Sequence, residues 1–197
     1  MSLYITADYH VGHENIIKYC DRPFKSLEEH DRHIITAHNT RIGEKDHFIH
    51  NGDFCFRNSP GGKKGEGTTK KSGFYISQLN GNGTFILGNH DSNNTLKTYI
   101  KSIVLSWGKG EYFVTHRPEN ANKHFPINFV GHVHNQYKFY RKRIDERFVD
   151  LVNVGIDVWG YMPRRIEEIL KEYHRWTKTK EYHQAVKDQK ELKYLKS

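Results

Sequence analysis

Short clusters of acidic, imidazole and amide side chains recur along the chain in a fixed order. They are Asp8-Tyr9-His10, Gly52-Asp53, Gly88-Asn89-His90-Asp91, His116 and Gly131-His132-Val133-His134. Nearly every cluster follows a short β-branched or aromatic run, so we expect each to lie at the end of a strand. Carboxylates, imidazoles and one amide, brought together from several strand ends, are the ligands that a site for two divalent cations requires.

Asp53 has the position expected of a ligand shared between two cations. A bridging carboxylate lets two metal ions sit about 3.5–4 Å apart and hold one water between them. An aspartate at a tight strand end suits this role, and Gly52 allows the backbone to turn there without a steric penalty. Asp8 and His10 could then reach one ion together and the amide oxygen of Asn89 the other. The three later histidines of the clusters would complete both shells.

The ligand types also bear on the metal and on the reaction. Oxygen and imidazole ligands without a thiolate favour Mn²⁺, with Fe, Zn or Ni as alternatives. A water held by two such ions loses a proton near neutrality and can attack phosphorus in line. His90 is next to a ligand in the sequence but is not needed as one, so it could protonate the leaving oxygen as a general acid.

Strands and helices alternate along the chain at a spacing typical of an α/β layered domain. We expect strands at residues 2–7, 47–51, 84–87, 111–115, 128–130 and 147–154. A capping-box pattern at Ser26 predicts a helix that continues to about Ile42. Further helices are expected at residues 14–19, 74–79 and 93–101.

Two segments contain most of the net positive charge. The 197 residues have a formal net charge of +8, and residues 61–72 (GGKKGEGTTKKS) hold four lysines and one glutamate. This stretch has no apolar residue, so we expect a mobile basic loop. Residues 164–197 are also basic, and an amphipathic helical pattern runs from Ile166 to Trp176. We therefore expect a domain at 1–163 and a basic helical C-terminal extension at 164–197.

The composition excludes several other classes of protein. No stretch approaches the roughly 20 apolar residues of a membrane span. A core strand is expected where a signal peptide would lie, so we expect a cytoplasmic protein without membrane contact. Two cysteines cannot form a disulfide framework. Amidohydrolases also use a His-x-His pair, but their barrel needs about 250 residues and the pair comes early in their sequence.

The order D-x-H, GD, GNHD, H and GHxH resembles that of the calcineurin-like metallophosphoesterase superfamily. The resemblance implies a four-layer α/β/β/α sandwich with two metal ions at the strand ends, Asp53 shared between them, and His90 in the position of the catalytic histidine. By motif match, the ligands of one metal would be Asp8, His10, Asp53 and His134. Those of the other would be Asp53, Asn89, His116 and His132.

One position departs from the protein-phosphatase branch of this superfamily. That branch extends its second motif to GDxxDRG, whose later aspartate orients the catalytic histidine. Here Phe56 replaces that aspartate, so either Asp91 or a backbone carbonyl must orient His90. Arg57 does match the arginine of the motif and is a candidate for binding the substrate phosphate.

Two segments instead resemble small bacterial and phage-type members, namely DYHVGHENI at 8–16 with RPF at 22–24, and NVGIDVW at 153–159. His13 could contact the substrate phosphate, or it could pack or cap a helix. Arg117 is a candidate for phosphate binding or an ordinary loop residue, and Arg22 is a weaker candidate. The histidines that match no motif are expected at the surface: His30, His33, His38, His47, His50, His124, His174 and His183.

These patterns predict a metal-dependent phosphoesterase that hydrolyses phosphomonoesters or phosphodiesters. A nuclease or RNA-processing phosphodiesterase, using the same site with the basic loop and tail, is the alternative, because basic segments attract phosphate-bearing partners. We find no aromatic and basic stacking surface of an RNA-binding module. A non-catalytic scaffold is disfavoured because every ligand position is filled. The expected partners are phosphate esters, nucleotides or nucleic acid, and no pattern indicates an oligomeric state.

Overall fold

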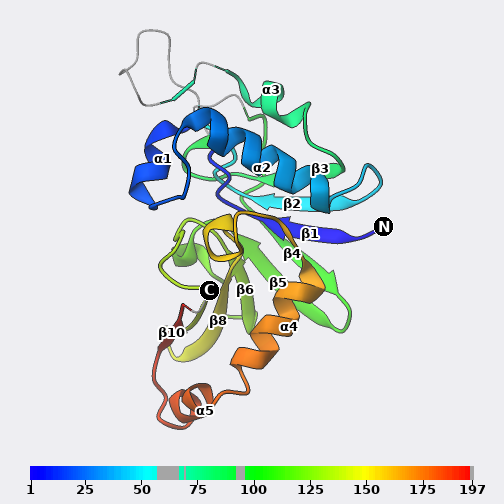
Figure 1. Ribbon diagram of the computed structural model, residues 1–197. Helices are drawn as coiled ribbons and strands as arrows, with labels where there is room; N and C mark the ends of the chain where they lie inside the picture. The colour runs from blue at the N-terminus through cyan, green and yellow to red at the C-terminus, as the bar shows by residue number, and fades with distance from the viewer. Residues whose placement is uncertain (57–66, 69, 92–95, 196–197) are drawn as a thin grey trace.

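Two β-sheets pack face to face in the computed structural model of the protein, which describes residues 1–56, 67–68, 70–91 and 96–195. The strand order is β3-β2-β1-β9 in the first sheet and β10-β7-β8-β6-β5-β4 in the second. Figure 1 shows helices flanking both sheets. The predicted α/β sandwich is therefore confirmed. No helix in the described ranges combines the length and the apolar character needed to cross a bilayer.

The first sheet is built from parallel strands. β1 (Leu3–Thr6), β2 (His47–Asn51) and β3 (Asn82–Ile86) run in one direction, and the short β9 (Arg164–Arg165) pairs antiparallel with β1. The helices α1 (Glu14–Tyr19), α2 (Leu27–Arg41) and α3 (Ser72–Ile76) lie on one side of it (Figure 1). Ser26 caps α2 as predicted, because its side-chain oxygen accepts from the Glu29 N–H at 3.2 Å.

The second sheet combines parallel and antiparallel pairs. β5 (Gly110–Thr115), β6 (Ile127–Val130) and β8 (Arg147–Asn153) are parallel, whereas β4 (Ser102–Trp107), β7 (Phe139–Ile144) and β10 (Leu192–Tyr194) pair antiparallel with their neighbours. The sequence prediction missed these last three strands. β7 contains three basic residues and β10 spans three residues, so neither has the apolar pattern of a core strand.

The C-terminal segment contributes to both sheets. It begins with β9 on the first sheet, continues through α4 (Ile166–Trp176) and α5 (Lys180–Lys187), and ends with β10 on the second. The amphipathic pattern predicted α4 correctly, since Ile169 and Trp176 are buried in the core between the sheets. The hydroxyls of Tyr173 and Tyr182 both donate to Asp150 Oδ2 on β8, at 2.6 and 2.7 Å. A domain boundary at residue 163 stays a prediction.

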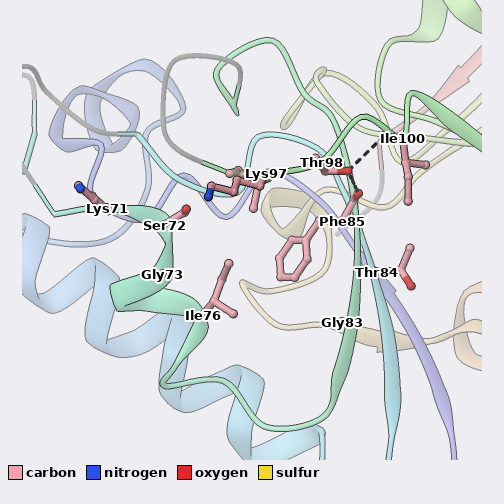
Figure 2. Close-up of a pocket in the computed structure, with 11 residues that line it drawn as sticks. Lys71, Ser72, Gly73, Ile76, Gly83, Thr84, Phe85, Lys97, Thr98 and Ile100 are labelled. Carbon is pink, nitrogen blue, oxygen red and sulfur yellow. Dashed lines mark hydrogen bonds between the residues drawn. The ribbon is translucent and has the colours of Figure 1, made fainter.

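The helix predicted at residues 93–101 is wrong for residues 96–101, which run beside β3 without forming a helix; residues 92–95 lie outside the described ranges. The Thr98 hydroxyl donates to the Phe85 carbonyl at 2.6 Å, as Figure 2 shows. The Leu87 N–H donates to the Ile100 carbonyl at 2.7 Å. A threonine side chain that bonds to a neighbouring strand competes with the helical backbone pattern.

A cavity of about 750 Å³ opens between this segment, β3 and α3. Ile76, Phe85 and Lys97 are among the residues that line it (Figure 2). No predicted metal ligand contributes to its walls. The predicted mobile loop at 61–72 lies next to it in the sequence, but residues 61–66 and 69 fall outside the described ranges, and Ser72 begins α3.

Three histidines that were expected at the surface are fully buried: His30, His38 and His50. His38 has partners, since its Nδ1 lies 2.9 Å from the Tyr9 hydroxyl and its Nε2 lies 2.9 Å from the Asn80 carbonyl. His50, on β2, packs against the rings of Tyr9 and Phe54. Neither of its ring nitrogens meets a hydrogen-bond partner among the described residues. Burial is the main cause that lowers the pKa of His50, to about 3. It is also the main cause that lowers the pKa of His38, to about 4.

The His50→Phe variant is expected to be more stable than the wild type at pH 7, by about 1–3 kcal/mol, because it removes two buried and unsatisfied polar atoms. Its stability should also fall less on acidification. Below pH 6.5 the unfolded chain binds protons that the buried neutral imidazoles do not bind, so wild-type stability falls as the pH drops toward 4. Urea unfolding at several pH values measures both effects. The control is His47→Phe, which changes an exposed residue on the same strand. Equal acid sensitivity of the His50→Phe variant and the wild type would contradict the burial of a neutral His50 imidazole.

Candidate metal centre

The predicted metal ligands converge where parallel strands end. Asp8, Asp53 and Asn89 follow β1, β2 and β3, while His116 and His132 follow β5 and β6. The carboxyl ends of parallel strands meet at one edge of a sheet, and here the edges of both sheets adjoin. The described residues contain four groups of possible ligand atoms that lie within 4.8 Å of one another. Two of these groups consist only of predicted ligands: Asp8 with His10 and His134, and Asp53 with His116 and His132. Asn89 joins the second group, because its Oδ1 lies 3.2 Å from His116 Nε2.

Asp53 lies between the two groups. Its Oδ2 is 3.6 Å from His10 Nε2 and 3.2 Å from His116 Nε2. Its Oδ1 accepts a hydrogen bond from the His90 N–H at 2.9 Å. Burial by itself would raise the pKa of the Asp53 carboxyl, but His116 beside it lowers that pKa to about 2. The carboxylate is therefore ionised and faces imidazole nitrogens on both sides.

The imidazoles are oriented as metal-binding histidines usually are. His116 Nδ1 lies 2.8 Å from the Asn51 carbonyl and His134 Nδ1 lies 3.0 Å from Asp157 Oδ2. An acceptor at one nitrogen fixes the proton there and leaves the other nitrogen as a ligand. In His10, Nε2 is buried and no described residue hydrogen-bonds to it. This set of oxygen and nitrogen atoms, with orphaned buried members, fits divalent cations.

The backbone of the site is strained at five of the ligands. Their φ angles are positive: Asp8 (60°), His10 (51°), Asp53 (55°), His132 (71°) and His134 (46°). Few residues other than glycine adopt this region, although aspartate and histidine do so more often than most. Strain of this kind persists only where surrounding contacts impose it, and it clusters at functional sites. Five of the nine described non-glycine residues with positive φ therefore belong to the sequence motifs.

The Asp91 carboxylate ties together the loops that follow β2 and β3. It accepts hydrogen bonds from the N–H groups of Asp53 at 2.8 Å, Phe54 at 2.9 Å and Gly88 at 2.8 Å. Gly88 must be glycine for this packing, since a Cβ there would lie 2.1 Å from the Asp53 nitrogen. Whether Asp91 also orients His90 stays a prediction, but these bonds show that it fixes the position of Asp53.

His90 lies above the site in a group of aromatic rings. Its ring centroid is 5.2 Å from that of His10 and 5.6 Å from that of His13. His13 in turn stacks on Phe56 with centroids 4.4 Å apart. His13 occupies the N-cap position of α1, but its side chain makes no cap hydrogen bond there. Its ring packs beside the site, and contact with the substrate phosphate stays a prediction. Phe56, which occupies the position of the later aspartate in the phosphatase motif, is part of this group of rings.

Sequence reasoning missed a buried ion pair behind the site. Arg22 donates from Nε to Asp157 Oδ1 at 2.8 Å and from Nη2 to Asp157 Oδ2 at 2.9 Å, and both side chains are almost inaccessible to solvent. The same guanidinium donates to the carbonyls of Asp8 and Tyr9. Because Asp157 also accepts from His134, the pair supports ligands from both sheets. Both residues belong to the segments resembling phage-type members, which was the available signal.

Two buried asparagines at strand ends were also missed. Asn51, the last residue of β2, donates from Nδ2 to the Thr115 carbonyl on β5 at 2.9 Å and so links the two sheets. Asn153, the last residue of β8, donates to the carbonyls of His134 and Tyr137 at 2.7 and 2.8 Å. An asparagine as the last residue of a predicted core strand is the sequence signal that could have identified them, because buried polar groups need hydrogen-bond partners.

Arg57 and Arg117 are the two remaining candidates for phosphate binding. Arg57 falls outside the described residues. Arg117 is exposed and lines a small cavity together with Asn89 and His116.

A family model extends the motif resemblance to almost the whole chain. The model for calcineurin-like phosphoesterases matches residues 1–191. The chain belongs to this family. In general terms the protein is a metal-dependent phosphoesterase, with phosphate esters as substrates and divalent ions as cofactors.

Individual proteins are similar to this chain at low sequence identity. An uncharacterized protein of Methanocaldococcus jannaschii, MJ1445, is 28% identical over 173 residues, which cover 86% of this chain and 89% of that protein. The crystal structure of AQ665, a protein of unknown function from Aquifex aeolicus, matches with a TM-score of 0.61 and 20% identity over 86% of this chain and 98% of that one. YfcE, a phosphoesterase from E. coli, matches with a TM-score of 0.43 and 14% identity over 78% of each chain.

Proposed function

We propose that the protein hydrolyses phosphomonoesters or phosphodiesters at a site for two divalent cations that share Asp53, with His90 as the general acid. The observation that carries this proposal is the environment of Asp53 Oδ2. This buried oxygen lies 3.6 Å from His10 Nε2 and 3.2 Å from His116 Nε2, so it stands between nitrogen atoms of both groups. A carboxylate placed between two sets of ligand atoms is what a ligand shared by two cations requires.

The two groups of ligand atoms divide the site as the motif match does. Asp8, His10 and His134 would hold one cation with Asp53. The second would be held by Asp53 with Asn89, His116 and His132, and Mn²⁺ is our first choice for both ions because hard oxygen donors accompany the imidazoles. When bound, the ions would activate a water molecule and neutralise charge on the phosphate.

The residues of the chain position the substrate and move the proton. The bond from the His90 N–H to Asp53 Oδ1 fixes the loop, so that the His90 imidazole stands beside the ligand groups and can donate a proton to the leaving oxygen. The stacked rings of His13 and Phe56 lie next to it, with the Phe56 ring centroid 6.3 Å from that of His90. His13, Arg57 and Arg117 are the residues that we propose contact the substrate.

Nuclease activity draws no further support from the described residues. The tail that could bind nucleic acid pairs with both sheets through β9 and β10. We therefore favour small phosphate esters.

A substrate panel with added Mn²⁺ tests the proposal. We expect hydrolysis of p-nitrophenyl phosphate, bis(p-nitrophenyl) phosphate or both, and its loss on chelation. A folded protein that binds metal and hydrolyses neither ester would disprove the catalytic function.

The role of His90 predicts a dependence on the leaving group. A general acid contributes about 10²–10⁴-fold to the rate, and it matters most when the leaving oxygen is a strong base. His90→Ala should therefore slow hydrolysis of an alkyl phosphate ester at least tenfold more than that of the p-nitrophenyl ester. His124→Ala, which changes an exposed histidine, is the control. Equal losses on the two esters would exclude proton donation by His90.

A further inference from the structure

A small cavity of about 160 Å³ adjoins the metal centre on the side of Asn89 and His116. Two exposed cations line it, Lys101 and Arg117, together with Asn120. At about 30 Å³ per water molecule it has room for roughly five waters. A phosphoryl group fits this space, but it is below the roughly 300 Å³ at which pockets for drug-sized ligands begin.

Backbone pairing on both sides places Lys101 at this cavity. The residue before it, Ile100, accepts a hydrogen bond from the Leu87 N–H at 2.7 Å, just before the Gly88-Asn89 turn. The residue after it, Ser102, pairs with Thr115, just before His116. Lys101 therefore stands where the two sheets meet, next to a predicted metal ligand from each. The backbone of Lys101 is therefore held in place by the pairing of its two neighbours.

Among the described residues, no ion pair compensates the positive charge of the cavity. Neither Lys101 nor Arg117 forms a salt bridge with any residue in the described ranges. The nearby carboxylate of Glu119 does not line the cavity. Two cations beside a metal centre attract an anionic group. A phosphoryl group matches them in both charge and hydrogen-bonding geometry.

We infer that this cavity is a subsite for a second phosphoryl group of the substrate. The preferred substrate class would then carry two adjacent phosphoryl groups, one at the metal centre and the other between Lys101 and Arg117. This inference rests on the proposed function, because it places the scissile group at the metal centre.

Competition between two inorganic probes tests the inference. Phosphate and pyrophosphate are compared as inhibitors of p-nitrophenyl ester hydrolysis, with Mn²⁺ in large excess. Pyrophosphate should bind wild-type protein at least tenfold more tightly than phosphate does. Lys101→Met and Arg117→Met should each reduce this preference several-fold, since each removes one charge-assisted contact. Lys109→Met removes a lysine from the opposite end of the β4–β5 hairpin and should leave the preference unchanged.

The same comparison by thermal denaturation of the metal-loaded protein does not require turnover. Pyrophosphate should raise the melting temperature more than phosphate in the wild type and in the Lys109→Met variant, and by a smaller margin in the Lys101→Met variant. Chelation of Mn²⁺ is common to all three proteins and cannot produce that difference. Absence of the preference in the wild type, or an undiminished preference in Lys101→Met, would overturn the subsite. Absence of hydrolysis with the preference intact would instead overturn the proposed catalytic function alone.

Discussion

Asp53→Asn is expected to abolish metal-dependent hydrolysis and to reduce the amount of bound metal. The substitution keeps an oxygen that can accept from the His90 N–H, but it removes the negative charge that faces His10 and His116. Metal ions contribute several kcal/mol of transition-state stabilisation, and each 1.36 kcal/mol is a factor of ten in rate. We therefore expect a loss of activity on the order of 10³-fold or more. Steady-state kinetics with added Mn²⁺ and elemental analysis of the purified variant measure the two effects.

The matched control is Asp145→Asn. Asp145 lies on the surface and pairs with Lys123 at 2.7 Å, so the same chemical change should alter neither activity nor metal content. Circular dichroism of both variants in the presence of a chelator separates loss of metal from loss of fold. An Asp53→Asn protein that kept its metal content and its activity would show that Asp53 is not a shared ligand.

Asp157→Asn is expected to destabilise the protein by about 3–5 kcal/mol, because it leaves the buried Arg22 guanidinium without its counter-charge. It should also weaken metal binding about 10–100-fold, since Asp157 fixes the ring of His134 from behind. Urea unfolding with a chelator measures the first effect. Competition for metal against a chromophoric chelator measures the second.

A double variant separates these two consequences. In Arg22→Met/Asp157→Asn no charge is left unpaired, so part of the lost stability should return. Metal affinity should stay low, because the acceptor for His134 is still altered. Full recovery of metal affinity in the double variant would show that Asp157 acts only as the partner of Arg22. The exposed change Lys123→Met provides the baseline for a broken surface pair.

The sequence predicted which of the candidate ligands come together, because each motif is a local pattern at a strand end. Asp8, Asp53 and Asn89 follow apolar runs that pair in register in one sheet, so their meeting follows from parallel pairing alone. The helical pattern of residues 166–176 predicted α4 for a similar reason. Such features depend on neighbours in the chain and on the period of burial, both of which can be read from the letters.

The missed features depend on contacts between distant residues. Arg22 and Asp157 are separated by 135 positions, and nothing in the pattern around either residue indicates that they are paired. His50 was expected outside because imidazoles are usually solvated, yet it fills a space among aromatic rings. Residues 96–101 have a composition compatible with a helix, but the free edge of β3 offers them other hydrogen bonds. Tertiary packing overrides local preference in each case.

Because the two sheets each supply part of the candidate ligand set, metal occupancy is also a cross-link between distant parts of the chain. The N–H of His132 already donates to the Asp8 carboxylate at 3.0 Å across 124 positions of sequence. A metal ion whose free concentration is a thousand times its dissociation constant would raise the free energy of unfolding by about 4 kcal/mol. Metal supply would then govern the lifetime of the protein as well as its chemistry, and the metal-free form would open first along the seam between the sheets.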